Sequence, residues 1–194
     1  MPTEYHQVEL FGGAITANLP STFADVSDIR QVPDHQEVWL DKDGFTSIIV
    51  EILERVEKSD DIEALRYHLE DIVQEDWGEM KMWSSNQAHF AKLPKYTPAY
   101  TLLATSPPGE KQRGRQNEPD FIGILLTMVR LVQQKTDLIV AINVPHVPGN
   151  YDKAEVDPAS GKQGKLLHEA EEIRKQVMET FEVIDWSLFV QVDD

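Results

Sequence analysis

Two apolar, β-rich runs at residues 121–132 and 138–144 limit the fold more than any other feature of the sequence. Only a short polar segment, residues 133–137, separates them. Both runs stay apolar at successive positions, so each is expected to be buried on both faces. The pattern predicts a long central hairpin, with a helix as the alternative for the first run.

Two shorter hairpins are predicted on the N-terminal side of this pair. Residues 5–10 and 14–19 are extended candidates on either side of a Gly-Gly pair, whose backbone freedom suits a tight turn. Residues 37–40 and 47–56 are rich in β-branched and aromatic side chains, and an Asp-Gly sequence between them suits chain reversal. Both pairs are therefore expected to join a sheet.

Two amphipathic helices are predicted from apolar residues that recur at three- and four-residue spacing. The first covers residues 60–76, with Ser59 or Asp60 as its N-cap. The second begins at Gly164, with Ser160 as a candidate cap. Strand pairs, a helix, more strands and a final helix together predict an α+β sandwich in which helices cover a largely antiparallel sheet.

The chain of 194 residues fits one domain, residues 1–194, with a substantial core. Residues 106–119 and 145–162 are rich in Pro, Gly and charge, and each is long for a loop in a compact domain. We expect both to be mobile, surface-exposed insertions. Neither separates halves that would have convincing cores of their own, so a division into domains gains no support.

Charge excludes several classes of partner. The net charge of −16 repels phosphate backbones and anionic lipid surfaces, so nucleic-acid and membrane-surface binding are disfavoured. Residues 41–80 hold thirteen acids and four bases, which gives this segment −9. Such a segment can steer a basic protein surface into encounter, or can simply keep the protein soluble. No apolar stretch is long enough to span a bilayer, and the absence of cysteine fits the cytosol or nucleus.

Searches for catalytic and metal-binding motifs favour no enzyme class. Residues 161–165 lack the spacing of a phosphate-binding loop, and His168-Glu169 lacks the second histidine of a helical zinc site. The six histidines are scattered, and no serine-nucleophile turn is present. Acidic pairs such as Asp60-Asp61 are expected to be solvated helix residues. We therefore expect no catalytic residue, cofactor or metal in this chain, although a site assembled by folding in a cryptic cleft remains an alternative.

Several motifs resemble the Ran guanine-nucleotide release factor family, the Mog proteins. The most specific matches are residues 9–15 (Glu-Leu-Phe-Gly-Gly-Ala-Ile) and residues 25–38, which include Asp-Val-Ser-Asp-Ile-Arg-Gln-Val-Pro-Asp-His-Gln-Glu-Val. Residues 47–54 (Ser-Ile-Ile-Val-Glu-Ile-Leu-Glu), 67–71 and 136–145 follow in the same order. The resemblance implies an α/β/α sandwich with a central antiparallel sheet, found in nucleus and cytoplasm, that binds the GTPase Ran and releases its guanine nucleotide.

The resemblance also implies a partner-binding pair, which it places at Glu51 and Glu54. Glu51 stands where a relative can have Asp, which preserves the charge. Residues three apart face opposite sides of a regular strand, so a bulge or a strand end is expected at this point. Further residues expected to border the interface are Arg30, Asp34, Gln36 and Glu37. We expect a monomer, and the alternative function is a Ran-binding or membrane-protein trafficking adaptor that leaves the nucleotide in place.

Overall fold

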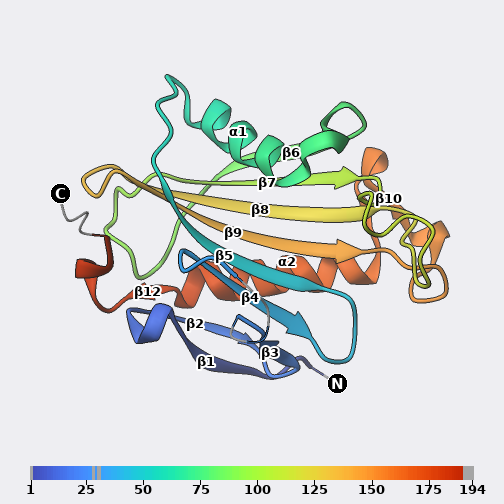
Figure 1. Cartoon of the computed structure of the whole chain (residues 1–194), viewed down its shortest axis with the longest axis horizontal. Helices are drawn as coiled ribbons and strands as arrows, with labels where there is room; N and C mark the ends of the chain where they lie inside the picture. Colours follow the sequence, from blue (N-terminus) through green and yellow to red (C-terminus); the bar gives the residue numbers. More distant parts are fainter. Residues whose placement is uncertain (1, 28, 30–31, 190–194) are drawn as a thin grey trace.

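The structure, a computed structural model, describes residues 2–27, 29 and 32–189. Its centre is a seven-stranded sheet in which every neighbouring pair of strands is antiparallel (Figure 1). In spatial order, the strands are β3 (Phe23–Asp25), β4 (Gln36–Asp41), β5 (Ser47–Glu54), β9 (Thr136–Pro145), β8 (Ile122–Leu131), β7 (Ala99–Ser106) and β6 (Lys81–Ala88).

The hairpin of β8 and β9 lies in the middle of this sheet and confirms the central prediction. Its register runs without interruption from Ile122 opposite Pro145 to Leu131 opposite Thr136. A helix over residues 121–132 is therefore wrong. Both strands lie inside the sheet, and a layer packs on each face, so their apolar side chains are buried on both faces. The turn is shorter than expected, because Thr136 and Asp137 are already part of β9 and are buried.

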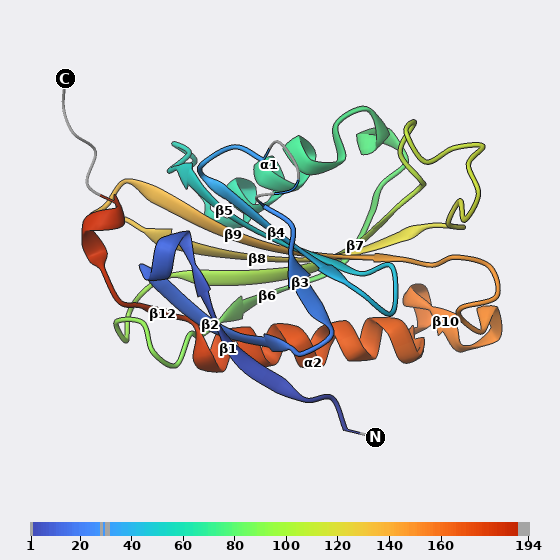
Figure 2. The same cartoon turned by 60° about the horizontal axis from the view of Figure 1, so that its bottom comes forward.

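Two layers cover the two faces of the sheet (Figure 2). One face is covered by α2 (Gly164–Thr180) together with a three-stranded sheet of β1 (Tyr5–Leu10), β2 (Ile15–Pro20) and β12 (Glu182–Val183). The other face is covered by α1 (Asp61–Val73), which packs on β7. This is the predicted α+β class, a central antiparallel sheet between helical layers.

The helix boundaries follow local chemistry. Asp60, one of the two predicted caps, is the N-cap of α1. Its carboxylate accepts a hydrogen bond of 2.6 Å from the Ile62 amide. The helix ends at Val73, earlier than expected, and the short 3-10 turn η2 (Gln74–Gly78) follows it. The predicted Ser160 cap of α2 is wrong: Ser160 ends the 3-10 turn η4 (Pro158–Ser160), and Gln163 is the N-cap, without a side-chain bond.

The two expected insertions differ from each other. Residues 107–118 form turns with hydrogen bonds of their own, such as the 2.8 Å bond from the Gln112 amide to the Gly109 carbonyl. The segment after β9 is only partly exposed, because His146 and Val147 are buried. It contains η3 (Lys153–Glu155), and a small hairpin of β10 (Val156–Asp157) and β11 (Lys162–Gln163).

Candidate partner-binding site

Glu51 lies on the face of the sheet that α1 covers. Side chains alternate along β5: Ile48 and Val50 are buried in the core under α2, while Ile49 and Leu53 are only partly buried beside α1. Glu51 lies between these last two residues and shares their face. Because α1 packs on β7, at some distance across the sheet, this side of β4 and β5 stays half open.

Gln36 holds the Glu51 carboxylate on this open face. The two residues are directly opposite each other in the β4–β5 register, so their side chains point the same way. The Gln36 Nε2 amide donates a hydrogen bond of 2.5 Å to Glu51 Oε1. Both side chains are half buried, which leaves part of the Glu51 carboxylate available to a partner.

Glu54 is the last residue of β5. A strand end was one of the two explanations expected for an acidic pair whose members are three residues apart. The register of β5 with β9 is continuous from Ser47 to Glu54, so there is no bulge, and the strand-end alternative holds. The side chain is exposed and lines a hollow of about 510 Å³ between the end of the strand, residues 55–58 and α1. From α1, Tyr67 and Asp71 form the opposite wall.

The other expected interface residues are divided between the two faces. Asp34 is exposed in the turn before β4, next to His35, whose carbonyl accepts a hydrogen bond of 2.8 Å from the Ile52 amide. Glu37 points to the opposite face, where its Oε1 accepts a 2.5 Å hydrogen bond from the Phe11 amide and ties β4 to the β1–β2 turn. Arg30 lies outside the described residues.

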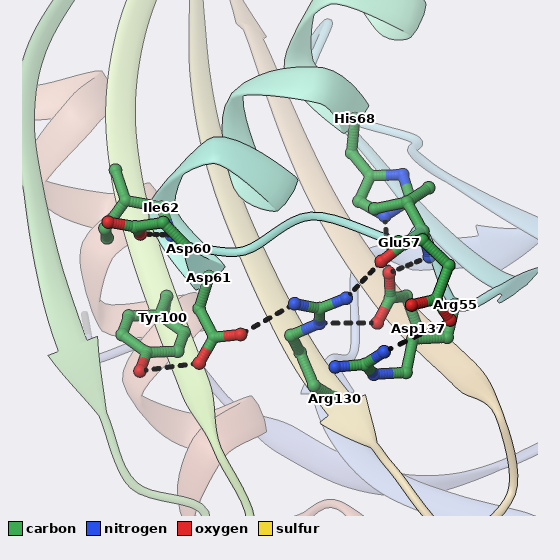
Figure 3. Close-up of polar contacts among 10 residues, drawn as sticks. Arg55, Glu57, Asp60, Asp61, Ile62, His68, Tyr100, Arg130 and Asp137 are labelled. Carbon is green, nitrogen blue, oxygen red and sulfur yellow. Dashed lines mark hydrogen bonds and ion pairs between the residues drawn. The ribbon is translucent and has the colours of Figure 1, made fainter.

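A buried ionic network fixes the wall of this hollow (Figure 3). Arg130 on β8 and Asp137 on β9 are almost wholly buried, and their Nε and Oδ1 atoms are 3.0 Å apart. The second carboxylate oxygen of Asp137 is 2.9 Å from Nε2 of the buried His68 of α1. Arg130 also donates to Asp61 at 2.6 Å, which links the start of the helix to the sheet.

The same network holds the segment that follows Glu54. The Arg130 guanidinium donates to the Val56 carbonyl at 2.6 Å, and the Val56 amide donates to Asp137 at 3.1 Å. Both backbone polar groups of Val56 are thus held by the network, which fixes the backbone that follows Glu54. The network positions the hollow and does not itself reach the open surface, since its central charges are buried.

Electrostatics keeps the network charged. Burial raises the pKa of the Asp137 carboxyl, but hydrogen bonds from His68, the Val56 amide and Arg130 outweigh this effect and hold that pKa below its ordinary value. Burial lowers the pKa of Arg130, yet its bonds to Asp61 and Asp137 raise it above the ordinary value. In the sequence, Arg130 is a cation within an apolar run, whereas Asp137 belongs to the short polar segment of residues 133–137 and shows no such contrast.

The fold and the open face together define a class of protein: an acidic α+β domain with a half-covered sheet face. Among the described residues there is no group of three or more His, Cys, Asp or Glu side chains placed to hold a metal ion. In that same part of the chain, no helix is long and apolar enough to cross a membrane.

Comparison with known proteins identifies the family. Residues 8–145 match the model of the Ran-interacting Mog1 protein family. The chain is 33% identical to the nuclear import protein MOG1 of Saccharomyces cerevisiae, over 94% of this chain and 84% of that protein. It is 29% identical to the probable Ran guanine nucleotide release factor of Dictyostelium discoideum, over 98% and 99% of the two chains. The chain belongs to the Ran-interacting Mog1 family.

Solved structures agree with this assignment. The crystal structure of the Ran-binding protein Mog1p of Saccharomyces cerevisiae matches with a TM-score of 0.74 and 31% identity, over 97% of this chain and all of that one. The solution structure of the cyanobacterial PsbP protein of Synechocystis matches with a TM-score of 0.53 and 11% identity, which shows a shared fold alone.

Proposed function

We propose that this chain binds the small GTPase Ran through the open face of β4 and β5 and promotes release of its guanine nucleotide. Support for the partner comes from the family and from the relatives, which are named Ran guanine nucleotide release factors and nuclear import proteins. Support for the place comes from Glu51 and Glu54, which lie on a half-open sheet face and in the hollow beside it.

The observation that carries the proposal is the preorganised Glu51 carboxylate. Gln36 holds it by a 2.5 Å hydrogen bond, and strand pairing with β4 and β9 fixes its backbone. A partner's cation therefore meets a carboxylate that has little conformational freedom left to lose, which lowers the cost of binding. Glu54 has its backbone fixed as the last paired residue of β5 and by the network that holds Val56.

Nucleotide release requires differential affinity. A protein speeds nucleotide loss only if it binds the empty or loosened GTPase more tightly than the loaded one. In this proposal, Glu51 and Glu54 bind basic groups of Ran that otherwise support phosphate and magnesium. The acidic segment of residues 41–80 raises the encounter rate through its charge of −9. No covalent bond changes in this chain, so it acts as a GTPase regulator without a catalytic site of its own.

The remaining interface residues have different roles in the proposal. Asp34 and Gln36 border the contact, and Arg30 is assigned to its edge from the resemblance alone. Glu37 acts indirectly, by fixing β4 to the β1–β2 turn through its bond from the Phe11 amide. We further propose that residues 1–194 work as one monomeric domain, in nucleus and cytoplasm, in nucleocytoplasmic protein transport.

A charge-reversal experiment tests the pair. Glu51→Lys together with Glu54→Lys is expected to abolish stimulated release of a fluorescent nucleotide from Ran, because two attractive contacts become repulsive. The matched control is Glu169→Lys with Glu172→Lys, which makes the same change of charge at the same spacing on the exposed side of α2. Release at the unaltered rate in the first variant would remove the pair from the mechanism.

The adaptor alternative predicts a different pattern. A chain that holds Ran, or a cytoplasmic segment of a membrane protein, without acting on the nucleotide would retain Ran in a pull-down but leave the release rate unchanged. Running both assays on the same preparation separates the two functions, because only a release factor changes the rate at which the nucleotide leaves.

A further inference from the structure

Tyr67 of α1 presents an aromatic ring to the hollow that Glu54 lines. The side chain is 47% exposed. Its ring packs T-shaped against the imidazole of the buried His68, with ring centroids 5.8 Å apart and the two planes at 81°. His68 is held in turn by its 2.9 Å contact with Asp137. Tyr67 therefore offers a well-positioned aromatic face beside the acidic pair.

A cation of this chain already lies over that ring. Lys58 Nζ is 5.1 Å from the centre of the Tyr67 ring, within the distance at which an aromatic face attracts a positive charge. The backbone of Lys58 is held, because its amide donates to the Val56 carbonyl at 3.1 Å and the same carbonyl accepts from Arg130. The Lys58 side chain is exposed, so it can leave the ring while its backbone stays in place.

The charges that line the hollow are mixed, and only some of them are paired. The acids are Glu54, Glu57 and Asp71, and the cations are Arg55 and Lys58. Arg55 Nη1 lies 3.5 Å from Glu57 Oε1, so these two side chains compensate each other (Figure 3). Within the described part of the chain, Glu54 and Asp71 have no ion-pair partner. The hollow thus combines two unpaired carboxylates with one cation, Lys58, that lies on the ring.

We infer that Lys58 occupies, in the free protein, the position that a basic side chain of Ran takes in the complex. This inference rests on the proposed function and names the contact that Ran makes in the hollow. The Ran cation displaces the Lys58 ammonium from the Tyr67 ring and meets the carboxylates of Glu54 and Asp71. Tyr67 is then a specificity-determining residue of the Ran-binding face, and Lys58 is its internal competitor.

Lys58 itself indicates the chemistry of the occupant. The fold places an ammonium group over this ring, so the position accepts positive charge. An acidic side chain would be repelled by Glu54, by Asp71 and by the negative face of the ring. An apolar side chain would leave both carboxylates without a partner. The planar guanidinium of an arginine fits best, because it stacks on an aromatic face and keeps its N–H groups free for carboxylates.

Displacement of Lys58 should be easy for a partner with a well-placed cation. The contact between an exposed lysine and a ring is weak, and the released side chain regains rotamer freedom. The entering cation gains the ring and two carboxylates, whereas Lys58 gives up the ring alone. A partner without such a cation leaves Lys58 in place and gains nothing from Tyr67. The competition therefore favours one kind of partner over others.

The affinity of the full-length chain for nucleotide-free Ran tests the competition. Lys58→Ala is expected to tighten binding about threefold, because it leaves the ring free for the partner's cation. Tyr67→Leu keeps an apolar side chain but removes the aromatic face, and should weaken binding about fivefold. Tyr67→Phe keeps the face and should bind within about twofold of the wild type. In the Tyr67→Leu background, Lys58→Ala should no longer tighten binding.

The matched control is Lys175→Ala, which removes one exposed lysine from α2 on the closed face and should leave affinity within about 1.5-fold. Unchanged or weaker binding by Lys58→Ala, or an equal gain in Lys175→Ala, would overturn the inference while the proposed function stands. A gain that persists in the Tyr67→Leu background would also overturn it, because charge alone would then explain the gain. A wild-type chain that does not bind Ran would overturn the proposed function itself, and this inference with it.

NMR of the Lys58 side chain follows the displacement directly. Ring currents shift protons above an aromatic face upfield, so the ε-CH2 protons of Lys58 should lie upfield in the free wild type and at the ordinary lysine position in Tyr67→Leu. Addition of nucleotide-free Ran should return the wild-type signals to the ordinary position. Absence of the upfield shift in the free chain, or its persistence in the complex, would contradict the displacement.

Discussion

The two faces of the central sheet differ in how completely they are covered. On one face, α2 and the three-stranded sheet form a closed layer over a large core, whose buried members include Leu10, Ile15, Leu125 and Leu167. On the other face, α1 forms a smaller core with β7, β8 and β9 and leaves β4 and β5 half open. The closed face therefore serves stability, and the open face is available for binding.

Strand β5 shows what this difference means within a single element. Ile48 and Val50 point to the closed face and are buried, whereas Ile49 and Glu51 point to the open face and are not. The family motif over residues 47–54 thus combines buried structural residues and residues that we propose to bind Ran in one strand, and the alternation of side chains separates them. A substitution in this motif acts on stability or on binding according to its face.

The largest expected effect comes from the network under α1, which joins the open face to the core. Asp137→Ala leaves the buried Arg130 without its main partner, and a broken buried ion pair costs about 3–5 kcal/mol. Urea denaturation should show this loss of stability. The stimulated rate of nucleotide release from Ran should also fall, because residues 55–58 lose the hydrogen bonds that hold them. Unchanged stability would contradict the view that the network fixes this region.

A substitution on the closed face should lower stability without changing Ran binding. Leu167 on α2 is fully buried, so Leu167→Ala is expected to cost about 3 kcal/mol in the free energy of unfolding. Ile49→Ala, on the half-open face, removes a partly buried side chain and should cost about 1 kcal/mol while weakening Ran binding. Thermal unfolding and Ran affinity, measured for both variants, test these expectations. Weaker Ran binding by Leu167→Ala together with unchanged Ran binding by Ile49→Ala would contradict the proposed difference between the two faces.

Salt should act on the open face more than on the closed one. Raising ionic strength from about 0.05 to 0.5 M is expected to slow association with Ran by about tenfold, because screening weakens long-range attraction. Stopped-flow association rates measure this, and the dissociation rate should change less. An association rate that does not depend on salt would mean that the charge of residues 41–80 serves solubility alone.

The smallest expected effect comes from His146, at the end of the molecule beyond β9. Burial lowers the pKa of its imidazole below the ordinary 6.5, against opposing contributions from the Val144 carbonyl and Asp120. The unfolded chain therefore binds this proton more readily, so stability falls as pH drops through 6.5 toward the lowered value. Urea denaturation measures the free energy of unfolding at pH 7 and at pH 5.5. Its decrease between the two pH values should be up to about 1 kcal/mol larger in the wild type than in His146→Gln.

Local patterns predicted the elements that bury apolar side chains regularly. The β8–β9 hairpin, both helices and the hairpins around residues 12 and 43 follow from runs and spacings visible in a short window. Strand β6 was missed because it is a mostly exposed edge strand with no apolar alternation. Strand β7 was missed as well, although most of its side chains are buried. A polar edge strand is recognisable only by its pairing with a distant segment.

The candidate site was less accessible to sequence reasoning. Glu51 and Glu54 came from the family motif, and no local pattern separates them from the other acids of residues 41–80. The network was missed because its partners are far apart in sequence: Asp61 and Arg130 are 69 residues apart. The bond between Gln36 and Glu51 depends on the register of β4 with β5, which a pattern of residue types does not determine.

Chemical-shift mapping by NMR can show which face of the sheet binds Ran. Nucleotide-free Ran is added to the isotope-labelled chain, and the backbone amides whose signals shift are recorded. We expect these to cluster in β4, β5, residues 53–58 and the exposed side of α1, with α2 and the β1–β2 hairpin unaffected. Shifts concentrated in α2 or the β1–β2 hairpin would show that Ran binds the closed face, and the open face would lose its assigned role.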